Sequence, residues 1–311
     1  MREAELWAIT AYFNPAGYRR RRENFRRFRQ RLAVPLVAVE LGFGPDFELG
    51  PDDAEILVQI RGGDVMWQKE RLLNIALKAL PFSCRTVAWL DCDVIFERED
   101  WWERATEELK RTPVVQLFSS LSLMPRDAPA HHLRSEDTEA RLQALTVAVR
   151  SGRAAQECLA ETRIGSAHAY SASPAWAIRR DLLTTFGFYD ACIVGGGDTA
   201  LVSAVHGCFD HVLDRHRMNA SRSEHYLNWA RPVAEAVAGD IAFIEGEAFH
   251  LWHGSIDDRH YASRHMELSG FAFDPWTDIA AEDGSPWQWS SDKHAMHGYV
   301  ASYFNSRRED G

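Results

Sequence analysis

No stretch of about 18 apolar residues occurs anywhere in the chain, so the sequence predicts no membrane-spanning helix. Residues 1–7 also lack the apolar stretch of a signal peptide. The five cysteines are odd in number and have no C-x-x-C spacing, a pattern that favours reduced thiols over a disulfide framework or a cysteine metal site. We therefore expect a cytoplasmic protein, soluble or peripheral at the inner face of the membrane.

The chain also has no net positive charge. The chain has 35 Lys and Arg against 45 Asp and Glu, a formal charge of −10, which gives no indication of a nucleic-acid partner. No linker, internal repeat or low-complexity segment divides it, so we expect a single domain over residues 1–311. Aromatic residues, in contrast, include 11 Trp. Such residues fill cores or line sites for sugar-like ligands, and composition leaves both roles open.

Positive charge is concentrated in one segment, because Arg19 to Arg31 holds eight arginines. Tyr18, Phe25 and Phe28 lie between them at helical spacing, which predicts an amphipathic helix with a very basic outer face. This face is either simply solvated or attracted to an anionic lipid surface or an acidic acceptor.

Two carboxylates directly follow the buried strand that we predict at residues 86–90. Asp91 and Asp93 are separated by one residue, and in an extended chain such side chains point to the same side. Their charges repel unless a proton or cation relieves them. Ligands of open α/β sheets bind outside the carboxyl ends of strands. We therefore expect a Mg²⁺ or Mn²⁺ site here, with simple capping of a turn as the alternative.

Two further motifs contain candidate site residues. Gly196 and Gly197 precede Asp198 at the start of a predicted helix, where glycine permits close approach of the backbone to a ligand. Asp198 is a candidate general base for a hydroxyl, or else a helix cap. His250 and His253 flank the end of a predicted strand. Strand alternation places them on opposite sides, and His253, nearer the strand end, is the better ligand candidate, unless its role is structural.

The remaining pattern predicts alternating strands and helices, as in a βαβ series. Residues 125–164 have helical spacing, with Leu142, Leu145 and Val149 on one face, and are interpreted as a helical insertion. Strands are expected at 6–13, 34–41, 54–60, 114–118, 175–178, 242–244 and 248–252, and helices at 66–80, 98–110, 179–186, 199–206 and 292–307.

In their order along the chain, these motifs resemble glycosyltransferases of the GT-A fold. The residues that carry the resemblance are Trp67–Asn74 (WQKERLLN), Trp89–Val94 (WLDCDV), Gly187–Asp190 with Gly196–Asp198, and His250–Gly254 (HLWHG). Within that class the chain is similar to the galactosyltransferase and chondroitin-synthase-like group, which has a D-x-D motif. It departs from that group in having Gly197 before Asp198 where the group usually has Glu-Asp, and the insertion has no counterpart.

The resemblance implies a GT-A-like, Rossmann-like mixed central sheet flanked by helices. Residues up to about 120 would bind the nucleotide-sugar, and residues 121–311 the acceptor. It implies metal-dependent transfer of a sugar from a nucleotide-sugar, expected to be UDP-linked, to a hydroxyl of a glycan or other acceptor, with inversion and Asp198 as general base. Asp91, Asp93 and His253 would hold Mn²⁺ or Mg²⁺.

The same resemblance assigns the donor contacts. Phe13 and Asn14 would border the nucleobase or ribose, and Lys69 and Arg71 the nucleotide or diphosphate. Trp176, Tyr170 and Trp252 are candidates for packing on sugar faces. Three alternatives remain: a retaining transferase on the same fold, a phosphoryl or nucleotidyl transferase that uses two carboxylates and a metal, and a non-catalytic module that binds glycans or membranes.

Overall fold

The structure, a computed structural model, describes residues 4–129, 133–162, 170–261 and 263–311. Its centre is a seven-stranded sheet with the strand order β11-β6-β10-β4-β1-β2-β3. These strands are β1 (Leu6–Phe13), β2 (Leu36–Leu41), β3 (Ile56–Ile60), β4 (Thr86–Leu90), β6 (Val114–Gln116), β10 (Ala175–Arg179) and β11 (Ile241–Phe243). Strands β1 to β4 are parallel, whereas β10 runs antiparallel to both β4 and β6. The prediction of a mixed central sheet flanked by helices is confirmed.

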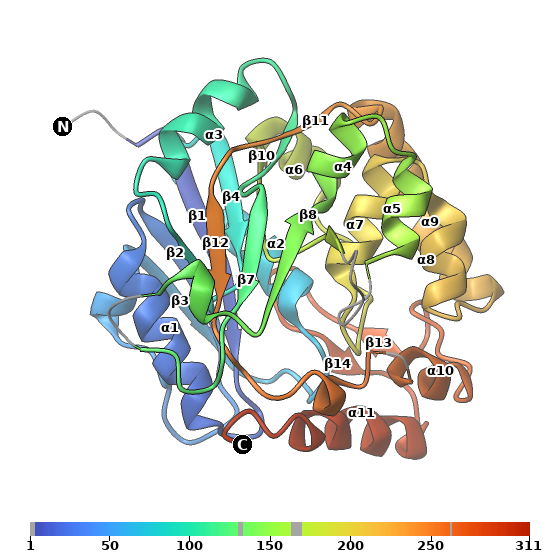
Figure 1. The fold of residues 1–311 in the computed structure, drawn as a ribbon. Helices are drawn as coiled ribbons and strands as arrows, with labels where there is room; N and C mark the ends of the chain where they lie inside the picture. The colour runs from blue at the N-terminus through green and yellow to red at the C-terminus, as the bar shows by residue number, and fades with distance from the viewer. Residues whose placement is uncertain (1–3, 130–132, 163–169, 262) are drawn as a thin grey trace.

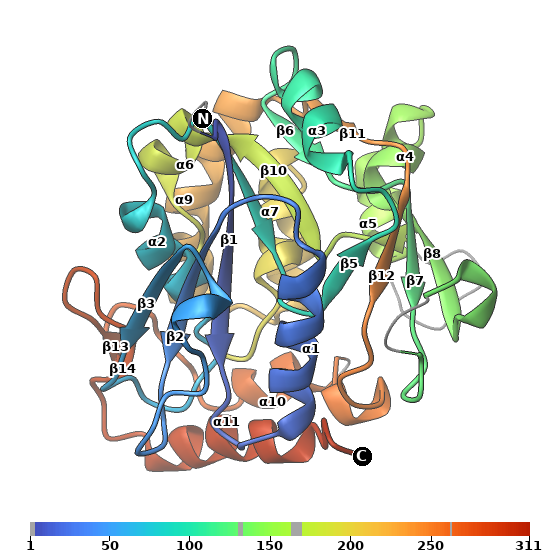
Figure 2. The same ribbon diagram turned by 90° about the vertical axis from the view of Figure 1, so that its left-hand side faces the viewer.

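Eleven α-helices are found in the described part of the chain. They are α1 (Arg19–Arg31), α2 (Lys69–Ala79), α3 (Trp101–Leu109), α4 (Leu145–Arg150), α5 (Ala155–Ala160), α6 (Arg180–Phe186), α7 (Gly197–Val205), α8 (Phe209–Arg215), α9 (Ala220–Val237), α10 (Arg264–Ser269) and α11 (His294–Ser306). Helices α2, α6, α7 and α9 contribute to the apolar cluster on one face of the central sheet, and α1 and α3 to the cluster on the other (Figures 1 and 2).

Strand β1 shows why the central sheet is buried on both faces. Ile9 and Phe13 belong to the first apolar cluster, whereas Ala8 and Tyr12, which alternate with them, belong to the second. A strand covered on both sides forms a nearly continuous apolar run, which is the signal that the sequence gives for β1, β2 and β4.

A second sheet, with the strand order β5-β12-β7-β8-β9, lies beside the first (Figure 2). Its strands are β5 (Val94–Phe96), β7 (Ser120–Leu123), β8 (Ala140–Ala144), β9 (Tyr170–Ser171) and β12 (Glu247–His250), and a two-stranded sheet is formed by β13 (Ile279–Ala280) and β14 (Gln288–Trp289). The chain crosses from the first sheet to the second at residues 91–93, between β4 and β5. Strand β12 pairs antiparallel with β5 and places His250 opposite Val94.

The predicted helical insertion at residues 125–164 is wrong in its first part. Strand β8 lies in its middle and pairs with β7, so Leu142 lies in a strand, while Leu145 begins helix α4. Short apolar spacings do not distinguish a helix from a strand whose partner is distant in sequence. Residues 130–132 and 163–164 of this prediction lie outside the described residues.

The basic segment forms helix α1 as predicted, with Phe25 and Phe28 buried. Part of its charge is paired within the protein, because Arg21 lies 2.7 Å from Glu309 and Arg29 lies 2.6 Å from Glu55. Contact of this helix with a membrane surface stays a prediction. Among the described residues, no helix combines the length and the apolar character needed to cross a bilayer.

Trp176 on β10 belongs to the core and does not form a sugar-packing surface. Its side chain is 2% exposed and stacks on Trp89 of β4, with ring centroids 6.2 Å apart and planes at 9°. We expect Trp176→Ala to lower the free energy of unfolding by about 3–5 kcal/mol, because it removes a large buried side chain.

Urea denaturation measures this loss. The matched control is Trp276→Ala, since Trp276 is 60% exposed and its removal should change stability by less than about 1 kcal/mol. Equal unfolding midpoints for Trp176→Ala and the native chain would contradict the assignment of Trp176 to the core.

Candidate metal centre and active site

A cavity of about 770 Å³ opens where β1 and β4 end, a size typical of small-molecule sites. Its wall combines residues that follow β4, the start of α7, and the chain after β12. The predicted site residues that line this cavity are Phe13, Lys69, Asp91, Asp93, Tyr170, Gly196, Asp198, His250 and His253. The fold therefore brings together carboxylates that are more than 100 positions apart in the sequence.

Besides Trp176 and Trp252, three predicted site residues are not among the described residues that line this cavity. Asn14 bonds to the backbone of the turn that opens α1. Arg71 donates to backbone carbonyls within residues 282–285 and lies over the ring of Trp287. Gly197 is the first residue of α7, where a Cβ atom would overlap the Glu70 carboxyl. In this structure all three support the frame of the site.

Asp93, His250 and His253 form a cluster whose candidate ligand atoms lie within 4.8 Å of one another. His250 Nε2 is 3.4 Å from Asp93 Oδ1, and His253 Nε2 is 3.6 Å from Asp93 Oδ2. The expectation that the two histidines lie on opposite sides is wrong, because β12 ends at His250 instead of continuing to residue 252. Both rings therefore face the same carboxylate.

The protonation states of this cluster fit a divalent cation. Burial raises the pKa of Asp93, but neighbouring His250 and the guanidinium groups of Arg21 and Arg259 outweigh it and hold this pKa below its ordinary value. Burial, together with Arg259, holds the pKa of His253 well below 6.5, so its imidazole is neutral. Asp93 Oδ1 is buried without a hydrogen-bond partner among the described residues. An ionised Asp93 carboxylate beside the neutral imidazole of His253 suits Mn²⁺ better than Mg²⁺.

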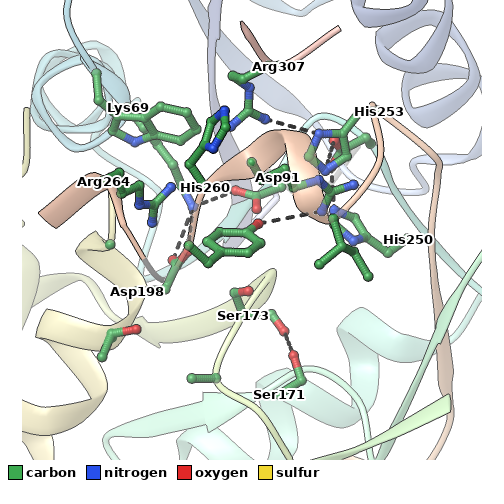
Figure 3. A pocket seen from close by; sticks show the side chains of 18 of the residues that line it. Lys69, Asp91, Ser171, Ser173, Asp198, His250, His253, His260, Arg264 and Arg307 are labelled. Carbon is green, nitrogen blue, oxygen red and sulfur yellow. Dashed lines mark hydrogen bonds and ion pairs between the residues drawn. The ribbon is translucent and has the colours of Figure 1, made fainter. Parts of the chain in front are cut away.

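Asp91 pairs with Lys69 and is not part of the cluster that the described residues form. Lys69 Nζ lies 2.6 Å from Asp91 Oδ1 and 2.9 and 3.0 Å from the two oxygens of Asp198 (Figure 3). Burial lowers the pKa of Lys69, but the two carboxylates outweigh it and hold this pKa well above the ordinary value. A charged ammonium therefore joins the end of β4 to the first turn of α7.

Behind His253 lies a buried group of charges that the sequence reasoning missed. Arg307 Nη2 is 3.2 Å from His253 Nδ1, and Glu309 accepts hydrogen bonds from both Arg307 and Arg21. A guanidinium can only donate, so Nδ1 accepts and the proton lies on Nε2, toward Asp93. A metal bound to Nε2 requires the tautomer with the proton on Nδ1. Because a protonated Nδ1 cannot accept a hydrogen bond, metal binding at Nε2 also requires that Arg307 releases its contact with His253. No sequence spacing connects residues 307–309 with position 253.

No protein-family model and no curated protein sequence matches the chain. Among solved structures, it is similar to glucosyl-3-phosphoglycerate synthase from Mycobacterium tuberculosis in complex with Mn²⁺, UDP and phosphoglyceric acid (15% identity over 89% of this chain and 81% of that one, TM-score 0.44). It is also similar to S. aureus TarS 1–349 in complex with UDP-GlcNAc (12% identity over 97% of this chain and 72% of that one, TM-score 0.40). A third similar structure is 4-diphosphocytidyl-2C-methyl-D-erythritol synthase from Anaerococcus prevotii (11% identity over 84% of this chain and 96% of that one, TM-score 0.39). Likeness of fold does not assign an activity, so the site itself carries the functional argument.

The buried charges behind His253 generate a prediction about pH. Burial raises the pKa of Glu309, but Arg21 and Arg307 outweigh it and lower the pKa from 4.5 to about 2. The resulting stability is fully present above pH 4.5 and is lost as the pH falls through 2. A shift of this size corresponds to about 3 kcal/mol. We expect Glu309→Gln to lower the free energy of unfolding by about this amount at pH 7 and by progressively less toward pH 2.

Urea denaturation at a series of pH values measures both the loss and its pH dependence. Glu107→Gln is the control, because Glu107 is an exposed partner of Lys110 and should leave stability unchanged. If Glu309→Gln lowers the free energy of unfolding by the same amount at every pH from 7 to 2, the guanidinium groups do not stabilise the Glu309 carboxylate.

Proposed function

We propose that the chain is a metal-dependent glycosyltransferase of the GT-A type, which transfers a sugar from a nucleotide-sugar, UDP-linked by the family resemblance, to a hydroxyl of a glycan or other acceptor. The observation that carries this proposal is that Asp93, His250 and His253 line the same cavity as Asp198. A metal beside the leaving group and a carboxylate beside the attacking hydroxyl are the two requirements of this reaction.

The residues divide between donor and acceptor. Asp93, His250 and His253 would hold Mn²⁺, which neutralises the charge that develops on the departing diphosphate. Phe13 borders the nucleobase or ribose in this proposal, and the part of the chain up to about residue 120 binds the donor. Asp198 is contributed by the acceptor half.

Asp198 serves as the general base in this proposal, removing the proton of the acceptor hydroxyl as it attacks the anomeric carbon. Each carboxylate oxygen has two lone pairs, so Asp198 can accept this hydrogen bond while it is paired with Lys69. The ammonium occupies one lone pair on each oxygen of Asp198. A donor phosphate that takes over the Lys69 contact would free these lone pairs, and we therefore keep the prediction that Lys69 contacts the diphosphate. In this arrangement the sugar transfers with inversion.

Nucleotide binding provides the first test of the proposal. We expect UDP to raise the melting temperature of the native chain by several degrees in Mn²⁺ and not in EDTA, because a ligand at about 100 times its dissociation constant stabilises by roughly 2.7 kcal/mol. Asp93→Asn should lose this response. The measurement is a thermal-shift panel of UDP, GDP and CDP with Mn²⁺, Mg²⁺ or EDTA.

Asp46→Asn provides the control for that panel, because Asp46 is exposed and lies outside the cavity. A nucleotide response that survives Asp93→Asn would place the metal elsewhere. The absence of any nucleotide response in any metal would remove the glycosyltransferase proposal and favour a binding module.

Asp198→Asn tests the chemical step separately from binding. The amide keeps the shape of the side chain but cannot take a proton, so we expect kcat to fall by about 100-fold or more while the UDP and Mn²⁺ response remains. Release of UDP from UDP-sugar measures the rate, and NMR of the product gives the anomeric configuration. Retention of configuration, or full turnover by Asp198→Asn, would contradict the assigned role.

A further inference from the structure

A second group of polar side chains lines the cavity beyond Asp198. It consists of Arg264 on α10, the adjacent His265, and His216 at the end of α8, and we call it the far-wall cluster. These residues are buried, with exposed fractions of 6%, 4% and 1%. The two imidazole rings stack with centroids 3.9 Å apart and planes at 9°. The metal-ligand cluster does not include any of the three.

The far-wall cluster has unused hydrogen-bonding capacity. Among the described residues, Arg264 Nε and the Nδ1 atoms of His216 and His265 are buried without a partner. Arg264 donates to the Tyr303 hydroxyl at 2.8 Å, but in the described part of the chain it makes no ion pair with a carboxylate. A guanidinium is always charged, and a buried charge is unfavourable unless an anion pairs with it. In Figure 3, the Arg264 head group points into the same space as Asp198.

The start of α7 lies against the far-wall cluster. Gly196 precedes the nine-residue helix with φ 101°, and a Cβ there would lie only 2.7 Å from His216 Nε2 and 3.2 Å from His265 Nε2. Glycine therefore lets the positive end of the helix approach both imidazoles closely. Of the acids nearby, Asp198 is already paired with Lys69, and burial raises the pKa of Glu70 to about 8. The far wall thus holds positive potential that these acids do not neutralise.

We infer that the far-wall cluster binds an oxyanion, a phosphate or a carboxylate, carried by the acceptor. This inference rests on the proposed function, because it places the hydroxyl of an anionic acceptor beside Asp198. The metal cluster accounts for the donor diphosphate, and Figure 3 shows His250 and His253 on one side of Asp91 and Arg264 on the other. Lys69 cannot serve as the acceptor's cation while Asp91 and Asp198 hold it.

The first test measures the binding of inorganic phosphate to the full chain by calorimetry, without metal or nucleotide. We expect the native chain to bind phosphate and Arg264→Gln to bind it about tenfold more weakly or worse, since a hydrogen bond between charged groups is lost. Arg264→Lys should retain part of the affinity. Arg231→Gln is the matched control, because Arg231 is exposed on α9, and it should bind as the native chain does.

Circular dichroism and melting temperature verify that each variant is folded, and His265→Gln gives a second variant in case Arg264→Gln does not fold. Phosphate binding is then repeated with saturating UDP and Mn²⁺. Unchanged affinity would support separate donor and anion sites. Displacement of phosphate by UDP, or no phosphate binding by the native chain, would overturn the inference.

Turnover distinguishes the two sources of the anion. With UDP-sugar and Mn²⁺, glucose 6-phosphate or glucuronate should accelerate UDP release more than neutral glucose does. A higher rate with glucose 6-phosphate would identify the anion as a phosphate, and a higher rate with glucuronate would identify it as a carboxylate. Equal rates with all three would contradict an anionic acceptor. Failure of the proposed function is recognised separately, because Asp93→Asn should lose nucleotide binding and keep phosphate binding. Phosphate binding in a native chain that binds no nucleotide would support the anion site and reject the glycosyltransferase.

Discussion

The buried ammonium of Lys69 is the interaction on which the cavity depends. Asp91 and Asp198 come from opposite halves of the chain, and both lie within 3.0 Å of Lys69 Nζ. Without this charge, two carboxylates would face each other in a poorly solvated space, where like charges repel strongly. Lys69 is held in turn by its position at the start of α2, which packs against β1 and β2. The core of the central sheet therefore fixes the relative positions of Asp91 and Asp198.

The second sheet helps to assemble the candidate metal-ligand cluster of Asp93, His250 and His253. Asp93 lies where the chain leaves β4, and antiparallel pairing of β5 with β12 brings His250 to the same place. The backbone strengthens this contact, because Leu251 N donates to Asp93 O at 2.8 Å. At Gly254, with φ 97°, a Cβ would meet the backbone of Arg307, so glycine allows the segment after α11 to close behind His253. Three segments distant in sequence thus position one carboxylate and two imidazoles.

Sequence patterns predicted much of the central sheet because burial on both faces produces long apolar runs, as in β1 and β4. They also drew attention to Asp93, Asp198 and His253, which line the cavity, because unusual charge at strand ends and glycine before a helix are local signals. They did not reveal that Lys69 bridges two carboxylates, or that His250 joins His253, since both depend on contacts between distant segments. Arg71 and Asn14 are predicted from the sequence to contact the donor, yet in the structure they bond to backbone atoms of residues 282–285 and of Tyr18. The far-wall cluster of His216, Arg264 and His265 gives no local signal.

A crystal structure of the chain with Mn²⁺ and UDP, with data collected near the manganese absorption edge, would locate both the metal and the nucleotide. We expect one anomalous peak bound by Asp93, His250 and His253, with the diphosphate of UDP on the metal and Asp198 facing the open space beyond it. A manganese ion bound by other residues, or UDP outside this cavity, would contradict the proposed site.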